Sequence, residues 1–152
     1  MEIKTSRFGV LEVDPGDIIT FTQPIIGFQE FRRFLVLPGP ADSAVSWLQS
    51  TESEDLAFLL MDPTHVIADY QVKLGSHELA ELAVSGVEEL EVYTILVVAQ
   101  DPSKIRTNLK APILINSRQR LGKQTVLEKS DYPIQFFLAQ ARQGSAAPEE
   151  VR

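Results

Sequence analysis

The chain has 152 residues, a formal net charge of −7 and no cysteine, which excludes disulfide bonds, thiolate metal sites and a cysteine nucleophile. Its 44% of apolar residues predicts one globular domain with a hydrophobic core. No run approaches the roughly 20 apolar residues that span a bilayer, and the first residues lack the apolar centre of a signal peptide, so we expect a cytoplasmic protein. The negative net charge disfavours nonspecific binding to nucleic acid or to a membrane surface.

Short runs of β-branched and aromatic residues alternate with turns rich in Pro, Gly and Asp, which is typical of strands and not of long helices. The predicted strands are residues 9–13, 18–22, 34–37, 45–49, 56–61, 90–99, 113–116, 124–127 and 134–138. Together they predict an all-β, mainly antiparallel single domain. Residues 95–99 are apolar throughout, which favours a central strand covered on both faces. We expect four of these apolar side chains in the core: Phe58, Leu96, Val98 and Ile115.

One short α-helix is predicted over residues 76–84. Ser76 is a suitable N-cap, and Glu78 lies in the first turn, where the helix dipole favours an acid. Beyond residue 139 the chain is small and polar, and it has too little apolar surface to offset the entropy of ordering it. We therefore expect a folded domain over residues 1–139 and a mobile C-terminal tail over residues 140–152.

Charge is distributed unevenly along the chain. Residues 42–91 include eleven acids and one base, whereas residues 104–129 include seven bases and one acid. One interpretation is that the two segments are neighbours in the fold and partly neutralise each other. The other is that the acidic segment offers a face to a basic partner, with Glu88, Glu89 and Glu91 as one candidate cluster.

The sequence is poor in residues that could perform catalysis. His65 and His77 are isolated from any second histidine or carboxylate at a metal-ligand spacing. The eight glycines occur singly at predicted turns, so no Gly-rich loop is available to hold a phosphate. Neighbouring acids such as Glu88 and Glu89 are more typical of a solvated face than of an acid/base pair. We therefore expect no enzyme activity, no cofactor and no metal.

An apolar segment over residues 24–31 is interrupted by Pro and Gly, which predicts an exposed loop. Its candidate contact residues are Ile25, Ile26, Phe28, Glu30 and Phe31. Two interpretations remain open. The rings either dock a partner protein, or they fold back as a plug over one end of the domain.

The basic segment over residues 104–129 allows an alternative function, a small β-barrel that binds RNA directly. Arg118, Arg120 and Lys123 flank a predicted turn and could contact phosphates. No aromatic residue occurs between Lys104 and Lys129, although single-strand binding surfaces usually combine bases with stacking rings. A solvated hairpin is the simpler interpretation.

Several short motifs follow one another in a distinctive order along almost the whole chain. They are Thr5-Ser6-Arg7-Phe8-Gly9, Ile18-Ile19-Thr20-Phe21, Gly27-Phe28 followed by Phe34, Trp47-Leu48-Gln49-Ser50, Leu56-Ala57-Phe58, Asp69-Tyr70, and Asn108 to Asn116 followed by Gln124. In this order they resemble the FliW family of flagellar assembly factors. The chain has Ile26-Gly27-Phe28-Gln29 where that family usually has Pro-Gly-Phe-Glu, and the tail after residue 139 lies outside the resemblance.

The resemblance implies a small β-barrel-like domain over residues 1–139, without catalytic activity. It also implies two protein partners bound in alternation, flagellin and the carbon storage regulator CsrA. CsrA is an RNA-binding dimer that represses translation of flagellin messenger RNA, and a FliW protein would antagonise it by binding away from the RNA-contacting surface. Accumulating flagellin would capture the FliW protein and restore repression. On this basis we expect a monomer when free, with no direct nucleic-acid partner and no membrane partner.

Overall fold

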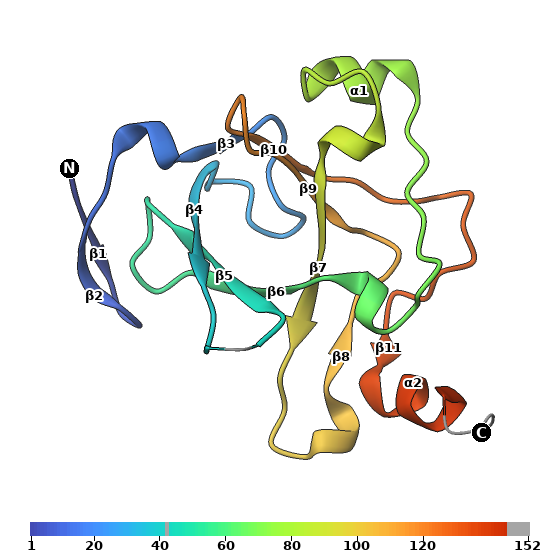
Figure 1. Ribbon diagram of the computed structural model, residues 1–152. Coiled ribbons are helices and arrows are strands. Elements are labelled where there is room, and N and C mark those ends of the chain that lie inside the picture. Colours follow the sequence, from blue (N-terminus) through green and yellow to red (C-terminus); the bar gives the residue numbers. More distant parts are fainter. Residues whose placement is uncertain (42, 146–152) are drawn as a thin grey trace.

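The computed structural model describes residues 1–41 and 43–145 (Figure 1). Its strands are β1 (Glu2–Thr5), β2 (Gly9–Glu12), β3 (Ile19–Phe21), β4 (Arg33–Pro38), β5 (Val45–Ser50), β6 (Ala57–Met61), β7 (Glu91–Val97), β8 (Arg106–Thr107), β9 (Ile113–Asn116), β10 (Leu121–Gln124) and β11 (Phe136–Phe137). Its α-helices are α1 (Ser76–Glu81) and α2 (Leu138–Ser145). Single 3₁₀ turns occur at Pro15–Asp17, Pro63–His65, Val87–Glu89 and Pro102–Lys104.

Seven strands close into a barrel in the order β7-β6-β5-β4-β3-β10-β9, because β7 also pairs with β9. Every neighbouring pair is antiparallel except β3 with β10, which is parallel. On one edge, the first half of β7 pairs with β9 and its end pairs with β8, while residues 94–96 pair with β6 on the other edge. β8 and β11 therefore extend the sheet away from the barrel at the end of β7. The β1–β2 hairpin lies beside the barrel as a separate sheet (Figure 1). The prediction of a mainly antiparallel all-β, barrel-like domain is therefore confirmed.

The barrel is filled by apolar side chains from its own strands and from the loop after β3. The buried cluster consists of Ile19, Phe21, Ile25, Phe34, Leu48, Leu60, Ile113 and Ile115. Of the predicted core residues, Ile115 is fully buried, while Phe58 and Leu96 are half-buried. Val98 is 62% exposed, so its assignment to the core was wrong. The reason is that β7 ends at Val97 and the apolar run continues into an exposed loop, not a covered central strand.

The predicted strand over residues 124–127 is shifted in the structure. β10 spans Leu121–Gln124, and the tight turn lies before it, where Arg120 has a positive φ of 56°. Gly122, predicted at a turn, lies inside β10. A Cβ there would be 2.7 Å from the Phe21 ring, so the glycine is needed for close packing against the core. β1 and β8 were not predicted at all.

The helices also differ from the sequence-based expectations. α1 ends at Glu81, three residues earlier than predicted, because Ala83 adopts a positive φ of 60°. Its N-cap is Gly75, and Ser76 is the first helical residue. α2 was not predicted, and it occupies the first part of the expected tail up to residue 145. Residues 146–152 of that tail lie outside the described residues. None of the described helices is long and apolar enough to cross a membrane.

Candidate protein-binding surface

The apolar segment predicted to dock a partner forms the ordered loop between β3 and β4. The Phe28 amide donates to the Ile25 carbonyl at 2.8 Å, and Gly27 between them has a φ of +91°, a conformation that favours glycine. Gln124 of β10 ties this loop to the barrel. Its Oε1 accepts from the Ile26 amide at 2.9 Å, and its Nε2 donates to the Ala111 carbonyl at 3.1 Å. The loop backbone is thus held in a defined conformation.

The five candidate side chains of this loop have different surroundings. Ile25 is buried in the barrel core, and Phe31 packs against that core while half-buried. Ile26 is 63% exposed, and Glu30 is also exposed. Phe28 is 36% exposed, and its ring meets the Phe58 ring edge-on at 5.0 Å between centroids. Ile25 and Phe31 therefore behave as the plug interpretation requires, whereas Ile26 and Phe28 leave apolar surface open to solvent.

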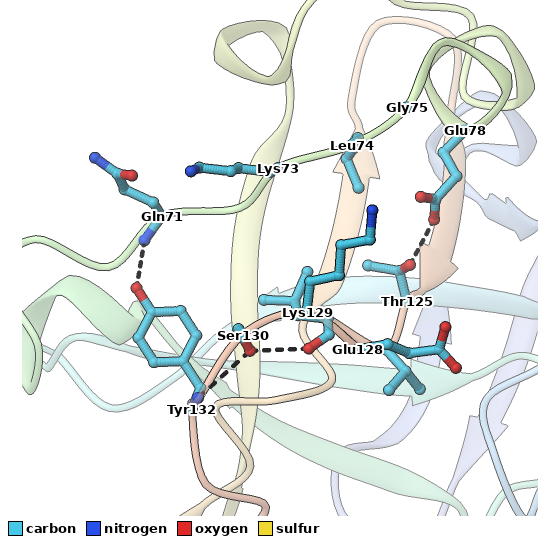
Figure 2. Close-up of a pocket in the computed structure, with 12 residues that line it drawn as sticks. Gln71, Lys73, Leu74, Gly75, Glu78, Thr125, Glu128, Lys129, Ser130 and Tyr132 are labelled. Atoms are coloured by element: carbon cyan, nitrogen blue, oxygen red, sulfur yellow. Dashed lines mark hydrogen bonds between the residues drawn. The ribbon is translucent and has the colours of Figure 1, made fainter.

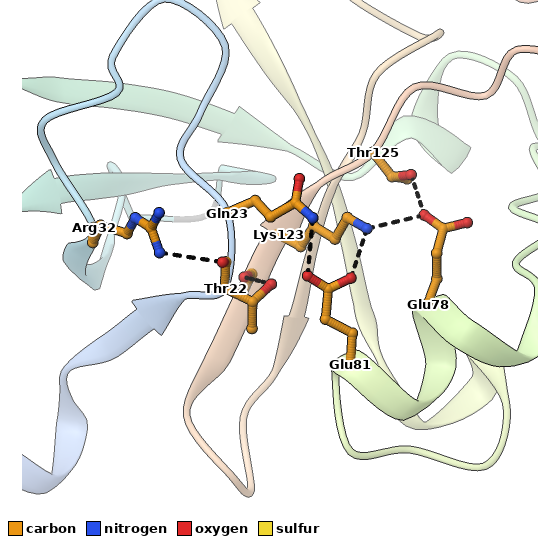
Figure 3. A network of polar contacts seen from close by, with 8 residues as sticks. Thr22, Gln23, Arg32, Glu78, Glu81, Lys123 and Thr125 are labelled. Atoms are coloured by element: carbon orange, nitrogen blue, oxygen red, sulfur yellow. Dashed lines mark hydrogen bonds and ion pairs between the residues drawn. The ribbon is translucent and has the colours of Figure 1, made fainter.

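Beside this loop a polar network joins α1 to β10 (Figure 3). Lys123 is only 7% exposed, and its Nζ lies 2.8 Å from Glu81 and 3.3 Å from Glu78. Glu78 also accepts from the Thr125 hydroxyl, and Glu81 accepts from Gln23 at 3.2 Å. The hydrogen bond from Lys123 lowers the pKa of Glu81. Burial opposes the charge on Lys123, but the hydrogen bonds and charges of Glu81 and Glu78 outweigh it and raise its pKa.

This network shows where the acidic and basic segments of the chain meet. Lys123 belongs to the basic segment, and Glu78 and Glu81 belong to the acidic one. The interpretation that the two segments partly neutralise each other inside the fold is therefore correct at this point. Other acids remain on the surface and are free of this contact.

In the acidic cluster, Glu88 and Glu89 lie in the 3₁₀ turn between α1 and β7, Glu91 is the first residue of β7, and all three side chains are exposed. Glu89 also has a structural role, because its carboxylate accepts from the Ser85 and Gly86 amides at 2.9 and 3.1 Å. Glu91 accepts from the Tyr93 hydroxyl at 2.8 Å. Burial, followed by this contact, raises the pKa of Tyr93. The cluster is thus a negatively charged surface beside a turn whose backbone is fixed by the hydrogen bonds of Glu89.

The three cations considered for RNA binding do not form one exposed set. Arg120 donates through its two terminal nitrogens to the carbonyls of Asp17 at 2.6 Å and Ser117 at 3.0 Å. Lys123 is buried in its ion pairs. Arg118 alone of the three is exposed, at the turn between β9 and β10. Sequence reasoning placed these residues correctly at a hairpin but did not detect that two of them are used inside the fold.

A groove that sequence reasoning missed lies between residues 71–75 and 125–132 (Figure 2). It has a volume of about 710 Å³, and Leu74, Val126 and Tyr132 are among the residues that line it. The Gln71 amide donates to the Tyr132 hydroxyl at 2.9 Å across one end of the groove. Residues 71–75 belong to no helix or strand, and sequence reasoning, which placed no element there, had no signal for the groove. Among the described residues, no group of His, Cys, Asp or Glu is arranged to hold a metal ion.

Comparison with known proteins matches this fold to one family over most of its length. The model of the FliW protein family matches residues 2–138. The chain is 41% identical over 133 residues to the flagellar assembly factor FliW of Natranaerobius thermophilus, covering 87% of this chain and 88% of the relative. It is 37% identical over 149 residues to that of Desulfitobacterium hafniense (strain DSM 10664 / DCB-2), covering 98% of each. A crystal structure of the flagellar assembly factor FliW superposes with a TM-score of 0.83 at 33% identity, covering 91% of this chain and 96% of that one. The chain belongs to the FliW family of flagellar assembly factors.

Proposed function

We propose that this flagellar assembly factor is a non-catalytic regulator that binds flagellin and CsrA in alternation. When flagellin is scarce, the protein binds CsrA and relieves repression of flagellin translation. When flagellin accumulates, it captures the protein and CsrA represses again. The observation that carries the proposal is the β3–β4 loop, which holds Ile26 and Phe28 exposed on a fixed backbone within a member of this family.

The loop has the features of a docking surface. An apolar anchor beside a polar rim is the usual composition of an interface hot spot. Here Ile26 and Phe28 supply the apolar centre, and Glu30 lies at the rim. Because Gln124 already fixes the loop, little conformational entropy is lost when a partner binds. We assign flagellin to this surface.

The acidic cluster suits the second partner. CsrA binds RNA and is therefore basic, and long-range attraction between opposite charges speeds the encounter of two proteins even where the final contact lies away from the RNA-contacting surface. Glu88 and Glu89 on the turn and Glu91 at the start of β7 present three exposed carboxylates close together in the chain. We assign CsrA to this face. Because α1, which precedes it in the chain, contacts Gln23 beside the flagellin loop, we expect the two bound partners to overlap and to exclude each other.

Direct RNA binding through the basic segment is the weaker alternative. Arg120 and Lys123 are engaged in contacts within the fold, which leaves Arg118 alone of the three candidates exposed. An isolated cation with no stacking ring beside it is a poor RNA-binding surface.

Binding experiments with purified components test the proposal. The protein is titrated with flagellin and with CsrA separately, and flagellin is then added to the preformed complex with CsrA. We expect each partner to bind and flagellin to displace CsrA. Failure to bind either partner, or a stable ternary complex in which flagellin displaces nothing, would contradict the alternation.

A further inference from the structure

Residues 71–75, which form one wall of the groove in Figure 2, have the pattern of a strand although they belong to none. Polar and apolar side chains alternate in Gln71-Val72-Lys73-Leu74, which is the period of a strand with one buried face. The two apolar side chains are half-buried against a cluster of buried leucines, and the two polar side chains are exposed. The segment therefore presents its side chains as a strand does.

The backbone of this segment lacks the partner that a strand would have. None of the amides and carbonyls of residues 72–74 forms a hydrogen bond with a residue that the structure describes. Only the flanking positions are bonded, since the Gln71 amide donates to the Tyr132 hydroxyl and the Gly75 carbonyl accepts from the Leu79 amide at 3.1 Å. Unpaired backbone groups along a strand-like segment are a template with which another extended chain can pair.

The opposite wall of the groove adds apolar surface. The Thr125 amide donates to the Pro112 carbonyl at 3.1 Å, and the Leu127 amide donates to the Lys110 carbonyl at 2.7 Å. Val126 lies between them, and its side chain lines the groove and is 43% exposed. The groove volume of about 710 Å³ lies within the range of about 300 to 1,000 Å³ that is typical of ligand-binding clefts.

The charges of the lining favour an acidic occupant. Lys73 and Lys129 are exposed there, and neither forms an ion pair with a residue that the structure describes. The Lys129 side chain points toward the opposite wall (Figure 2). Of the two acids in the lining, Glu78 already pairs with a lysine of β10, and the Glu128 carboxylate points away from both lysines in Figure 2. Two cations therefore face the groove without an anion.

We propose that the groove receives an extended segment of a partner protein, which adds as a strand beside residues 72–74 and directs an acidic side chain to Lys73 or Lys129. Backbone hydrogen bonds supply the affinity in this binding mode, and alternate side chains supply the specificity. The inference does not rest on the proposed function, because neither the β3–β4 loop nor the cluster of Glu88, Glu89 and Glu91 lines the groove.

Titration of the full-length protein with the peptide acetyl-Val-Glu-Val-Glu-Val-amide tests this assignment. NMR of the backbone amides of residues 72–74 reports pairing through downfield shifts and slowed hydrogen exchange. For a peptide this short we expect saturable binding with a Kd on the order of 1 mM. One control peptide has lysine in place of both glutamates, and the other has N-methylated peptide bonds, which keep the side chains but donate no backbone hydrogen bond. We expect neither control to bind.

Paired variants test the role of the two lysines. Lys73→Gln/Lys129→Gln is expected to weaken binding of the glutamate peptide about fivefold and to keep the melting temperature, because both side chains are exposed. The matched control, Lys4→Gln/Lys104→Gln, removes two exposed lysines elsewhere on the surface and is expected to bind as the parent does.

Two other occupants of the groove are tested with the same peptide. The C-terminal residues Glu149 and Glu150 are acidic, and Glu149→Gln/Glu150→Gln in the full-length chain is expected to bind the peptide as the parent does. A second copy of the chain is the other candidate, and we expect sedimentation equilibrium to show a monomer with and without the peptide.

The partner assignment is overturned by any of five results. They are no saturable shift up to about 20 mM peptide, equal binding of either control peptide, equal weakening in the control variant, tighter binding after substitution of Glu149 and Glu150, which would assign the groove to the chain's own tail, and a dimer that the peptide dissociates, which would assign it to a second copy.

Discussion

Phe28 and Phe31 lie three residues apart in one loop, yet they make different contributions. Phe31 packs on the barrel core, whereas Phe28 rests on Phe58 and keeps about a third of its surface exposed. A side chain held in this way by one aromatic neighbour contributes modestly to folding and can still supply apolar area to a partner. Substitutions at Phe28 and at Phe31 therefore test partner binding and fold stability separately.

Phe28→Ala is expected to weaken flagellin binding by roughly thirtyfold or more, because a hot-spot ring contributes about 2 to 4 kcal/mol to an interface. It should lower the free energy of unfolding by only about 1 kcal/mol, through the lost contact with Phe58. The matched variant Phe31→Ala should instead destabilise the fold by about 2 to 4 kcal/mol. Isothermal titration and urea denaturation of both variants measure these changes. Native flagellin affinity in Phe28→Ala together with a lowered melting temperature would contradict the docking role.

At the scale of elements, α1 is attached to the barrel by charge. It has six residues, which is too short to be stable alone in water. Lys123 of β10 holds it through Glu78 and Glu81, and Leu82 directly after the helix is buried against Leu114. The apolar contact and the ion pairs together place the turn that carries the acidic cluster.

Lys123→Met is expected to lower the free energy of unfolding by about 2 to 4 kcal/mol, because it leaves two partly buried carboxylates without their cation. Arg118→Met, on the exposed turn of the same hairpin, is the control and should change stability by less than about 0.5 kcal/mol. Urea denaturation followed by circular dichroism measures both. Equal stability of the two variants would show that the ion pairs add nothing to the apolar contacts of α1.

The contact between Lys123 and Glu81 also predicts that the free energy of unfolding depends on pH. Since Lys123 lowers the pKa of Glu81 below its ordinary value of 4.5, the charged carboxylate stabilises the fold above that pH. The contribution is lost as the pH falls from 4.5 through the lowered pKa of Glu81. The stability difference between the parent and Glu81→Gln is therefore expected to be largest at about pH 7 and to shrink in acid. A difference that stays constant down to about pH 3 would contradict this assignment.

The elements that could be predicted from sequence are those with a local cause. Asp14, Asp62 and Asp101 each precede a proline, and each accepts from the amide two residues ahead at the start of a 3₁₀ turn. The elements that were missed have tertiary causes. β8 has two residues and exists only because β7 and β11 flank it, and Gly122 lies in a strand because Phe21 packs against it.

In the candidate site, too, features with a local cause could be predicted from the sequence, and features with a tertiary cause could not. The apolar loop was recognised from its Pro, Gly and aromatic residues, because turn chemistry is local. The split between buried Ile25 and exposed Ile26 depends on which face meets the barrel, and that is decided by Gln124, about a hundred residues away. The burial of Lys123 likewise depends on α1, which is remote in the sequence.

For the molecule as a whole, we expect the placement of its negative charge, and not the total alone, to govern how it meets a basic partner. Replacing Glu88, Glu89 and Glu91 with Gln is expected to slow association with CsrA and to flatten the dependence of that rate on salt. Glutamine at position 89 keeps an oxygen for the Ser85 and Gly86 amides, so the fold should persist. Stopped-flow kinetics at several ionic strengths measure the effect. Exchanging the exposed Glu2, Glu12 and Glu128 for Gln removes the same three charges elsewhere on the surface and is the control. An equal slowing there would mean that total charge, not this cluster, steers CsrA.

We expect this protein to act on RNA only through another protein. Fluorescence anisotropy of a labelled flagellin leader RNA tests it most directly, with the protein alone, with CsrA, and with CsrA followed by flagellin. We predict that the protein alone leaves the anisotropy unchanged, that it releases the RNA from CsrA, and that flagellin reverses the release. An increase in anisotropy with the protein alone would show direct RNA binding, and RNA that stays bound to CsrA in its presence would show that the protein is no CsrA antagonist.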